Sequence, residues 1–554
     1  MKLYIYLLQV MSKQKLTIAL IPVILALGLV GGIFIGRTFT DRSLSPDEEK
    51  LKTILGLIQS EYVDDVSLDS IMDGTYAGLM AMLDPHSVYI PASDVETVTD
   101  ELEASFSGVG VSFQIINDTV SIIEIVPGGP AETIGLKPGD KILKADNKDL
   151  TGKNATNENV YKNLRGTKGS KVELTVKRPN SAKPVTFTVT RGDVPQTSVD
   201  AKYMLSENVG YVKVSKFART TYNEFLQALQ YLESKGAEKF VIDLRGNSGG
   251  YLDQAVLMVN EFLPPDRMIV YTKGKNPANE SAAVSNGGGN YLENELVVLT
   301  DEFSASASEI FAGAIQDNDR GLVIGRRTFG KGLVQNQIPL PDNSAIRLTV
   351  ARYYTPSGRS IQKEYKLGQG LQYEHELAER YKNGEFYNVD SIKLDKSKEF
   401  FTTQGRIVYG GGGIMPDVFV PEDTTGMTSY YIKVNNAGLL QQYAYDVAAQ
   451  QRSKLSAAKT VQQFMSSLPD DNTLIEGFAD YAATKGVPAQ WYYINQSRPL
   501  ILKQLKAIIA RDILGYAKFI EIYNIGDKTV DRALRALSAG ESPIVIMPSK
   551  NQRK

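Results

Sequence analysis

The segment KFVIDLRGNSGGYLDQAVLMVNEFL, residues 239–263, shows how the largest domain of this chain is built. Its first part, 239–245, is a short apolar run typical of a buried strand. GNSGG (246–250) predicts a sharp glycine-rich turn, and the residues after it predict a helix. A second unit repeats the order, with LVVLT (296–300) as a strand and SASASEIFAGAIQD (304–317) as a helix. Alternating strands and helices over 209–365 therefore indicate an α/β layer architecture.

Composition excludes several classes of protein. The 554 residues suggest two to four domains, and the net charge of -2 argues against a nucleic-acid partner. The chain has no cysteine and two histidines, His86 and His375, so thiolate zinc sites and a cysteine nucleophile are excluded. HELAE (375–379) lacks the second histidine of a zinc protease, and GRRTFGKG (325–332) lacks the Ser or Thr that ends a P-loop. We expect no metal and no cofactor.

The amino-terminal segment 16–36 carries no charge and has 21 residues, enough for a helix that crosses a bilayer. Lys13 and Lys15 precede it, which favours an amino terminus in the cytoplasm. We expect an uncleaved transmembrane anchor, with a cleaved signal peptide as the alternative. Met11 is an alternative start to Met1. Either way the rest of the chain lies across a membrane, and a bacterial envelope is expected, with the catalytic domain in the periplasm or otherwise outside the cytoplasm.

Two regions with different sequence patterns follow the expected anchor. Residues 37–104 read as a helical region, interrupted by LDPHSVYIP (83–91), where His86 is expected to hydrogen-bond within a loop. Residues 105–192 read as short strands separated by glycine and proline. Within them GGPAETIGLKPGD (128–140) resembles a PDZ domain, and SGVGVSF (107–113) resembles its carboxylate-binding loop and ligand-pairing strand. The expected substrate-binding residues are Gly108, Val109, Gly110, Val111 and Arg165. Arg165 ends the expected second PDZ helix, from which it can reach either the substrate tail or the protease domain. A solvated helix-end arginine is the alternative.

The serine-rich helix start and TFGKGLVQ (328–335) are the candidates for catalytic chemistry. A serine at a helix amino terminus is set where developing negative charge is favoured. Lys331 can act as its base if burial lowers the lysine pKa, and Gln335 can orient the amine. Backbone N–H groups after the serine and in the glycine turn are placed to form an oxyanion hole. Helix capping by small residues and a solvated lysine are the alternatives that spacing alone leaves open.

The order of the motifs resolves that choice. DLRGNSGG, SASASEI, TFGKGLVQ, YYTPSGRSIQ and GGIMPDV, with LDPHSVY and the PDZ-like module, resemble the carboxyl-terminal processing peptidases, or tail-specific proteases, over about 46–422. The resemblance implies Ser306 as nucleophile, Lys331 as general base and Gln335 as its assistant. It implies an oxyanion hole from Ala307 and Gly249. Ser248 replaces the proline often found in that turn.

The resemblance also implies a domain order and a function. We expect a crotonase-like α/β serine protease core at 193–422, with 366–403 as an irregular insertion, the PDZ domain inserted before it at 105–192, and a helical extension at 423–554. The implied function is an envelope endopeptidase that recognises exposed C-terminal tails of proteins and acts through an acyl-enzyme. A non-catalytic PDZ adaptor and an acyl-CoA enzyme of the crotonase type are the alternatives. The sequence leaves open whether the protein forms a homo-oligomer.

Overall fold

The computed structural model describes residues 45–103, 105–116, 118–178, 181 and 183–543. The chain divides into two units, one up to residue 76 and one from residue 77 onward. The expected membrane segment, 16–36, lies outside the described residues. Among the residues that are described, no helix has the length and apolar character needed to cross a membrane.

The first described elements are helical. α2 (Pro46–Glu61) begins with a capping box, in which Ser45 and Glu48 bond to each other's backbone N–H groups, and Pro46 occupies its first turn. α3 (Leu68–Ala81) and α4 (Ala92–Glu103) follow, with the short strand β1 (Val88–Ile90) between them.

The β-rich module forms a small sheet of strand order β3-β4-β5-β7-β8, with β6 paired to β5, and a separate pair of β2 and β9. Alternate residues of its strands, such as Val172, Leu174 and Val176, are buried in a common core. Its elements are β2 (Ser105–Gly108), β3 (Val111–Ile116), β4 (Thr119–Ile125), α5 (Pro130–Thr133), β5 (Lys141–Ala145), β6 (Lys148–Asp149), η1 (Gly152–Asn154), α6 (Asn157–Leu164), β7 (Lys171–Lys177), β8 (Val185–Thr190) and β9 (Gly192–Pro195).

A six-stranded sheet of order β10-β11-β12-β15-β16-β21 forms the centre of the α/β core. β10 is antiparallel to β11, and every other neighbouring pair is parallel. The two-residue strand β21 lies in the GGIMPDV region and closes one edge against β16. The strands are β10 (Val199–Met204), β11 (Val209–Val214), β12 (Lys239–Asp243), β15 (Glu295–Thr300), β16 (Leu322–Gly325) and β21 (Val418–Phe419).

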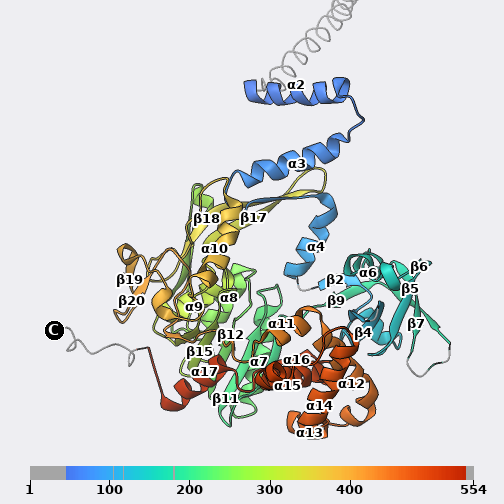
Figure 1. Ribbon diagram of the computed structural model, residues 1–554. Helices are drawn as coiled ribbons and strands as arrows, with labels where there is room; N and C mark the ends of the chain where they lie inside the picture. Colours follow the sequence, from blue (N-terminus) through green and yellow to red (C-terminus); the bar gives the residue numbers. More distant parts are fainter. Residues whose placement is uncertain (1–44, 104, 117, 179–180, 182, 544–554) are drawn as a thin grey trace, which may run out of the picture. The chain divides into compact units, whose positions relative to one another are not determined.

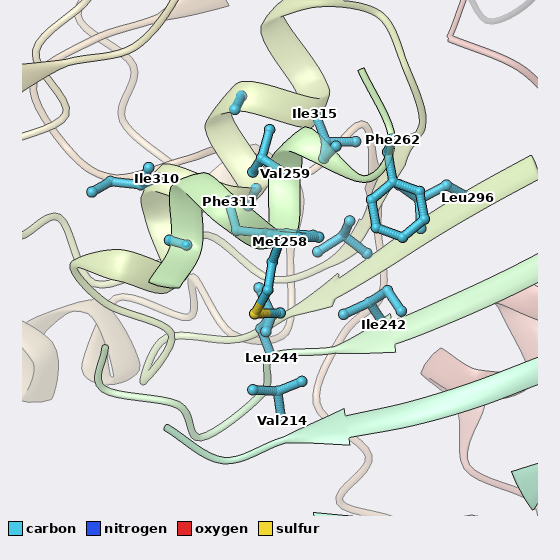
Figure 2. Packing of buried hydrophobic residues seen from close by; sticks show 14 of the residues in the cluster. Val214, Ile242, Leu244, Met258, Val259, Phe262, Leu296, Ile310, Phe311 and Ile315 are labelled. Atoms are coloured by element: carbon cyan, nitrogen blue, oxygen red, sulfur yellow. The ribbon is translucent and has the colours of Figure 1, made fainter. Parts of the chain in front are cut away.

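Both faces of this sheet are covered by helices, as parallel sheets require. On one face Ile242 and its alternate neighbours pack against α7 (Thr221–Glu233), α8 (Leu252–Asn260) and α9 (Ala307–Asp317). Figure 2 shows Ile242, Met258 and Phe311 in this cluster. The intervening residues, such as Val241, pack on the opposite face against α16 (Tyr516–Tyr523) and α17 (Lys528–Ala539). Figure 1 shows α17 beside β15.

A second sheet, of order β1-β18-β13-β14 with β17 paired to β18, carries the segment that follows Lys331. Its remaining elements are β13 (Met268–Gly274), η2 (Pro277–Asn279), β14 (Ser281–Val284), β17 (Leu333–Pro339) and β18 (Ala345–Tyr354). The segment 366–403, expected to be irregular, contains the thirteen-residue helix α10 (Gly370–Lys382). Tyr373 and Arg380 are buried on that helix, so tertiary packing stabilises a helix that the polar sequence conceals. η3 (Val389–Ser391), η4 (Lys396–Lys398) and the pair β19 (Glu399–Phe401) and β20 (Ile407–Tyr409) follow.

The carboxyl-terminal extension is helical, as expected, and has a hydrophobic core of its own. Ile501, Leu505 and Ile509 form the buried stripe of its longest helix. Its helices before α16 are α11 (Ser429–Asn436), α12 (Leu439–Leu455), α13 (Val461–Ser467), α14 (Asp471–Thr484) and α15 (Trp491–Leu514).

Candidate active site

Ser306 lies between β15 and α9, immediately before the first residue of the helix. Its backbone has φ 55° and ψ -113°, a conformation that non-glycine residues rarely adopt and that costs about 1–3 kcal/mol. The helix it begins is buried along its entire length, so the dipole at its amino terminus acts in a medium that screens charge poorly. Such strain is maintained only where the surroundings fix it.

The glycine-rich turn packs directly on Ser306. A Cβ atom added to Gly249 would lie 2.7 Å from the Cβ of Ser306, so any other residue at 249 would displace the serine. Gly249 also has φ 108°, which favours glycine. Ala305 N–H donates to the carbonyl oxygen of Asn247 at 3.0 Å, and this hydrogen bond fastens the turn to the serine segment.

The two predicted oxyanion donors differ. Ala307 is the first residue of α9, where a backbone N–H has no acceptor within the helix. The Gly249 N–H, in contrast, donates to Oδ1 of Asn247 at 2.9 Å, a turn in which an asparagine side chain bonds the N–H two residues later. The Gly249 N–H is therefore engaged by Asn247 in this structure, while the glycine lies against Ser306 as expected. Its part in the oxyanion hole stays a prediction.

Glu309 joins the serine segment to the lysine segment. Its Oε2 accepts the N–H groups of Ser306 and Lys331, both at 2.8 Å. Its Oε1 accepts the hydroxyl of Thr328 at 2.5 Å and the N–H of Gly330 at 2.7 Å. Burial raises the pKa of this carboxyl, and the four donors oppose that rise. The buried carboxylate thus sets the spacing of the two backbone segments.

Lys331 and Gln335 are brought together as predicted. The Lys331 amine donates to Gln335 Oε1 at 3.0 Å. Lys331 precedes β17, and the strand has an irregular register between Val334 and Gln335, so the contact does not arise from the simple strand spacing that the sequence suggested. Burial lowers the pKa of Lys331 and Arg347 lowers it further, while Glu309 acts in the opposite direction. The amine is therefore displaced toward its neutral form.

Tyr353 also links the backbones of Ser306 and Lys331 through hydrogen bonds. Its buried hydroxyl lies 3.1 Å from the carbonyl oxygen of Ser306 and 2.7 Å from that of Lys331. Among the described residues, Ser306 Oγ and Lys331 Nζ are not hydrogen-bonded to each other. The structure therefore fixes the two segments side by side and leaves the final approach to side-chain rotation.

His86 completes the support of Gln335. The Gln335 amide donates to the carbonyl oxygen of His86, while the imidazole Nε2 lies 2.9 Å from the hydroxyl of Tyr373. Asp84 holds this loop by accepting the N–H of His86 at 2.9 Å and the Thr349 hydroxyl at 2.9 Å. Burial lowers the pKa of His86 to about 4, and Lys331 adds to the effect. The sequence prediction of a loop hydrogen-bonding role holds, but the sequence did not place the loop beside the lysine.

The predicted PDZ loop is present in the β-rich module. Val109 is buried, and Gly110 has φ 82°. A Cβ on Gly110 would lie 3.1 Å from Gly129 Cα, so the loop backbone packs tightly there. Val111 begins β3, and Gly108 ends β2.

Arg165 directly follows α6, and its guanidinium stacks 4.5 Å from the ring of Phe106 and 5.1 Å from that of Tyr161. Gly108 and Arg165 form an isolated antiparallel bridge. Arg165 is therefore tied to the strand that leads into the loop, and it is not the freely solvated helix-end residue of the alternative reading.

Three functional residues escaped the sequence analysis: Glu309, Tyr353 and Asn247. Glu309 stands three residues after Ser306, and a glutamate at that place signals a capping box, but its bonds to the lysine segment depend on tertiary structure. Among the described residues, no cluster of three or more His, Cys, Asp or Glu is arranged to hold a metal ion.

Comparison with known families matches three parts of the chain. Residues 208–373 match peptidase family S41, 97–177 match the PDZ domain, and 430–515 match a family of unknown function, DUF8443. The chain is 34% identical over 329 residues to a carboxy-terminal-processing protease of Bartonella bacilliformis, covering 59% of this chain and 74% of that protein.

Two further relatives have similar names. The carboxy-terminal processing protease CtpB of Bacillus subtilis is 34% identical over 319 residues, which are 57% of this chain and 66% of that protein, about two thirds of its length. A solved structure, the photosystem II D1 C-terminal processing protease, is 28% identical and covers 56% of this chain and 83% of that one, with a TM-score of 0.33. The chain belongs to peptidase family S41, as a carboxy-terminal processing serine protease.

Proposed function

We propose that this chain is an envelope endopeptidase that cleaves proteins selected by their exposed C-terminal tails, with Ser306 as nucleophile and Lys331 as general base. The observation that carries the proposal is the setting of Lys331. Its buried amine has a lowered pKa and donates to Gln335, and Glu309 ties its backbone to that of Ser306. A lowered lysine pKa is typical of a functional site, because a lysine that only stabilises the fold usually keeps its charge.

The reaction follows from these groups. The neutral Lys331 amine takes the proton of the Ser306 hydroxyl as Oγ attacks the scissile carbonyl carbon. The Ala307 N–H, joined by Gly249 once Asn247 releases it, stabilises the oxyanion. The protonated amine then donates its proton to the leaving nitrogen as the C–N bond breaks, and an ester on Ser306 remains. Lys331 next takes a proton from water, the hydroxide attacks the ester, and the proton returns to Ser306 Oγ.

Substrate selection is assigned to the PDZ module. Backbone N–H groups around Gly108–Val111 are the expected site for a terminal carboxylate, and β3 offers an edge to which a peptide can add as a strand. Arg165, fixed beside this loop by Phe106 and Tyr161, supplies positive charge near the carboxylate.

The location is proposed from the sequence. The uncharged segment 16–36 anchors the protein in the inner membrane, with the catalytic domain outside the cytoplasm. Full-length protein then fractionates with membranes and resists carbonate extraction. A mature soluble form cut near residue 37 would show instead that the segment is a cleaved signal.

Serine substitutions test the assignment of the nucleophile. Ser306→Ala is expected to abolish hydrolysis of an unstructured peptide while leaving thermal unfolding unchanged. Ser308→Ala is the matched control, because among the described residues the Ser308 hydroxyl bonds only the carbonyl oxygen of Asn247, at 2.8 Å. It should cost about 1 kcal/mol of stability and keep most activity. Turnover by Ser306→Ala together with an inactive Ser308→Ala would show that the wrong serine was chosen.

A further inference from the structure

An ion pair joins the carboxyl-terminal helices to the strand end that leads into the glycine-rich turn. Asp527, the residue before α17, accepts two hydrogen bonds from Nη1 of Arg245, at 3.1 and 3.0 Å. The other guanidinium nitrogens, Nε and Nη2, donate to the carboxylate of Asp243 at 2.7–3.1 Å. Arg245 is therefore held between two carboxylates, one at the end of β12 and one from the carboxyl-terminal extension.

This pair is largely shielded from water. The side chains of Arg245 and Asp527 are 18% and 20% exposed, and that of Asp243 is 1% exposed. Burial works against the charge of Arg245, but Asp243 and Asp527 together raise its pKa. Tyr211 donates to Asp243 at 2.6 Å, and the Lys213 amine lies 3.3 Å from the same carboxylate. The network thus contains two cations, Lys213 and Arg245, and two carboxylates.

Arg245 directly precedes the glycine-rich turn. Its carbonyl oxygen accepts the Lys213 amine, and the next N–H, of Gly246, donates to both carboxylate oxygens of Asp301 at 2.9 and 3.0 Å. From there the turn runs to Asn247, whose carbonyl oxygen accepts the Ala305 N–H, and to Gly249 against Ser306. A displacement of Arg245 therefore moves the residues that pack on the nucleophile.

The helix that Asp527 caps, α17, packs tightly on the central sheet. Val530, Ala533 and Leu537 of α17 are buried against the sheet face that carries Val241 and Leu299. Lys239, at the start of β12, donates to the carbonyl oxygen of Leu537 at 2.7 Å. The first residue of β12 is thus bonded to α17, and Arg245, two residues after the strand ends, is bonded to the residue before α17.

We infer that Asp527 is a positioning residue for catalysis: through Arg245 it holds the glycine-rich turn against Ser306, so the carboxyl-terminal extension is part of the working protease. The inference rests on the proposed role of Ser306. Asp527, which caps α17, lies beyond the segment 430–515 that matches the family of unknown function.

Asp527 has a second role that the test must separate. Its Oδ1 also accepts the N–H groups of Thr529 and Val530, both at 2.9 Å, and so caps α17. Asparagine caps a helix as well as aspartate does but carries no charge. Asp527→Asn therefore preserves the cap and removes the carboxylate that Arg245 needs.

The experiment compares Asp527→Asn with Asp423→Asn in the full chain. Asp423 pairs at 2.9 Å with Lys528, the first residue of α17, on side chains that are 41% and 54% exposed, and it does not contact Arg245. Steady-state hydrolysis of one unstructured peptide gives kcat and KM. The acylation burst with an activated peptide ester gives the fraction of working sites, and thermal unfolding reports the fold.

We expect Asp527→Asn to lower kcat per working site by about 10- to 100-fold with KM changed less than 3-fold, because a misplaced turn weakens binding of the transition state alone. Asp423→Asn should stay within about 2-fold of wild type in kcat. Asp527→Glu should recover part of the lost rate.

Three results would overturn the inference. The first is an Asp527→Asn enzyme whose kcat per working site equals that of the wild type. The second is a loss of activity that appears only in the burst amplitude, because that amplitude reports fewer folded molecules. If Asp527→Asn does not fold, Asp527→Ser repeats the test with another capping residue, and failure of both to fold assigns Asp527 to folding alone. Activity in Ser306→Ala would instead contradict the proposed function, so the two failures are distinguishable.

Discussion

The Lys331 amine donates a hydrogen bond to Gln335 Oε1 at 3.0 Å. This bond orients the amine, and therefore restricts the directions in which its lone pair can point once the amine is neutral. Because the Gln335 amide is itself bonded to the His86 carbonyl oxygen, its own orientation is set. The general base is therefore oriented by a neutral partner, and its pKa is lowered by burial and Arg347.

Lys331→Arg should be as inactive as Lys331→Ala, because arginine keeps its charge at every pH at which proteins are folded. In the wild type, kcat/KM should rise with pH as Lys331 becomes neutral and should level off below the ordinary lysine pKa of about 10.4. Arg347→Gln removes a charge that lowers the Lys331 pKa, so its profile should move to higher pH. Substantial activity in Lys331→Arg would rule out lysine as the base.

Gln335→Ala should lower kcat by about 10- to 1,000-fold, the range expected when the group that orients a base is lost. Gln335→Glu is the sharper variant. Its carboxylate favours the charged amine, raises the Lys331 pKa and moves the rate profile to higher pH. Rate profiles that coincide for wild type and Gln335→Glu would place Gln335 outside the site.

His86 should contribute a pH-dependent part of the stability. Its pKa is about 4 in the folded chain and about 6.5 when unfolded. Between these values the unfolded chain binds the proton and the folded chain does not, so stability falls as pH drops from about 6.5 to about 4. His86→Gln keeps a polar side chain beside Tyr373 without titrating. Its melting temperature should fall less over this range than that of wild type, and parallel melting curves would contradict the assigned pKa.

The PDZ loop should read the substrate's terminal carboxylate. Amidating a tail-bearing substrate, or Gly110→Trp, should slow its cleavage far more than that of a short peptide at high concentration. The comparison uses native and amidated substrate on both enzymes, with melting curves as a control for the packing at Gly110. Tail recognition by this loop is wrong if amidation slows wild type and variant equally.

The sequence predicted this site unevenly, for physical reasons. Ser306, Lys331 and Gln335 lie within short motifs that resemble those of the tail-specific proteases, so the resemblance indicated them where their spacing alone did not. The bond from Lys331 to Glu309 and those from Tyr353 to Ser306 and Lys331 join residues 22 positions or more apart, and no local pattern encodes them. The sequence did not indicate that the side chain of Asn247 accepts the Gly249 N–H, because this turn depends on the local backbone conformation. Helix α10 was missed because its buried face consists of Tyr373 and Arg380.

The account depends most on Ser306 becoming acylated with Lys331 as the base. Intact-protein mass spectrometry during turnover of an activated peptide ester, followed by proteolytic mapping, measures this directly. We predict one acyl group on the peptide that contains Ser306, formed faster as pH rises in the wild type and absent from Ser306→Ala and Lys331→Ala. An acyl group on another residue, or undiminished acylation of Lys331→Ala at neutral pH, would contradict the account.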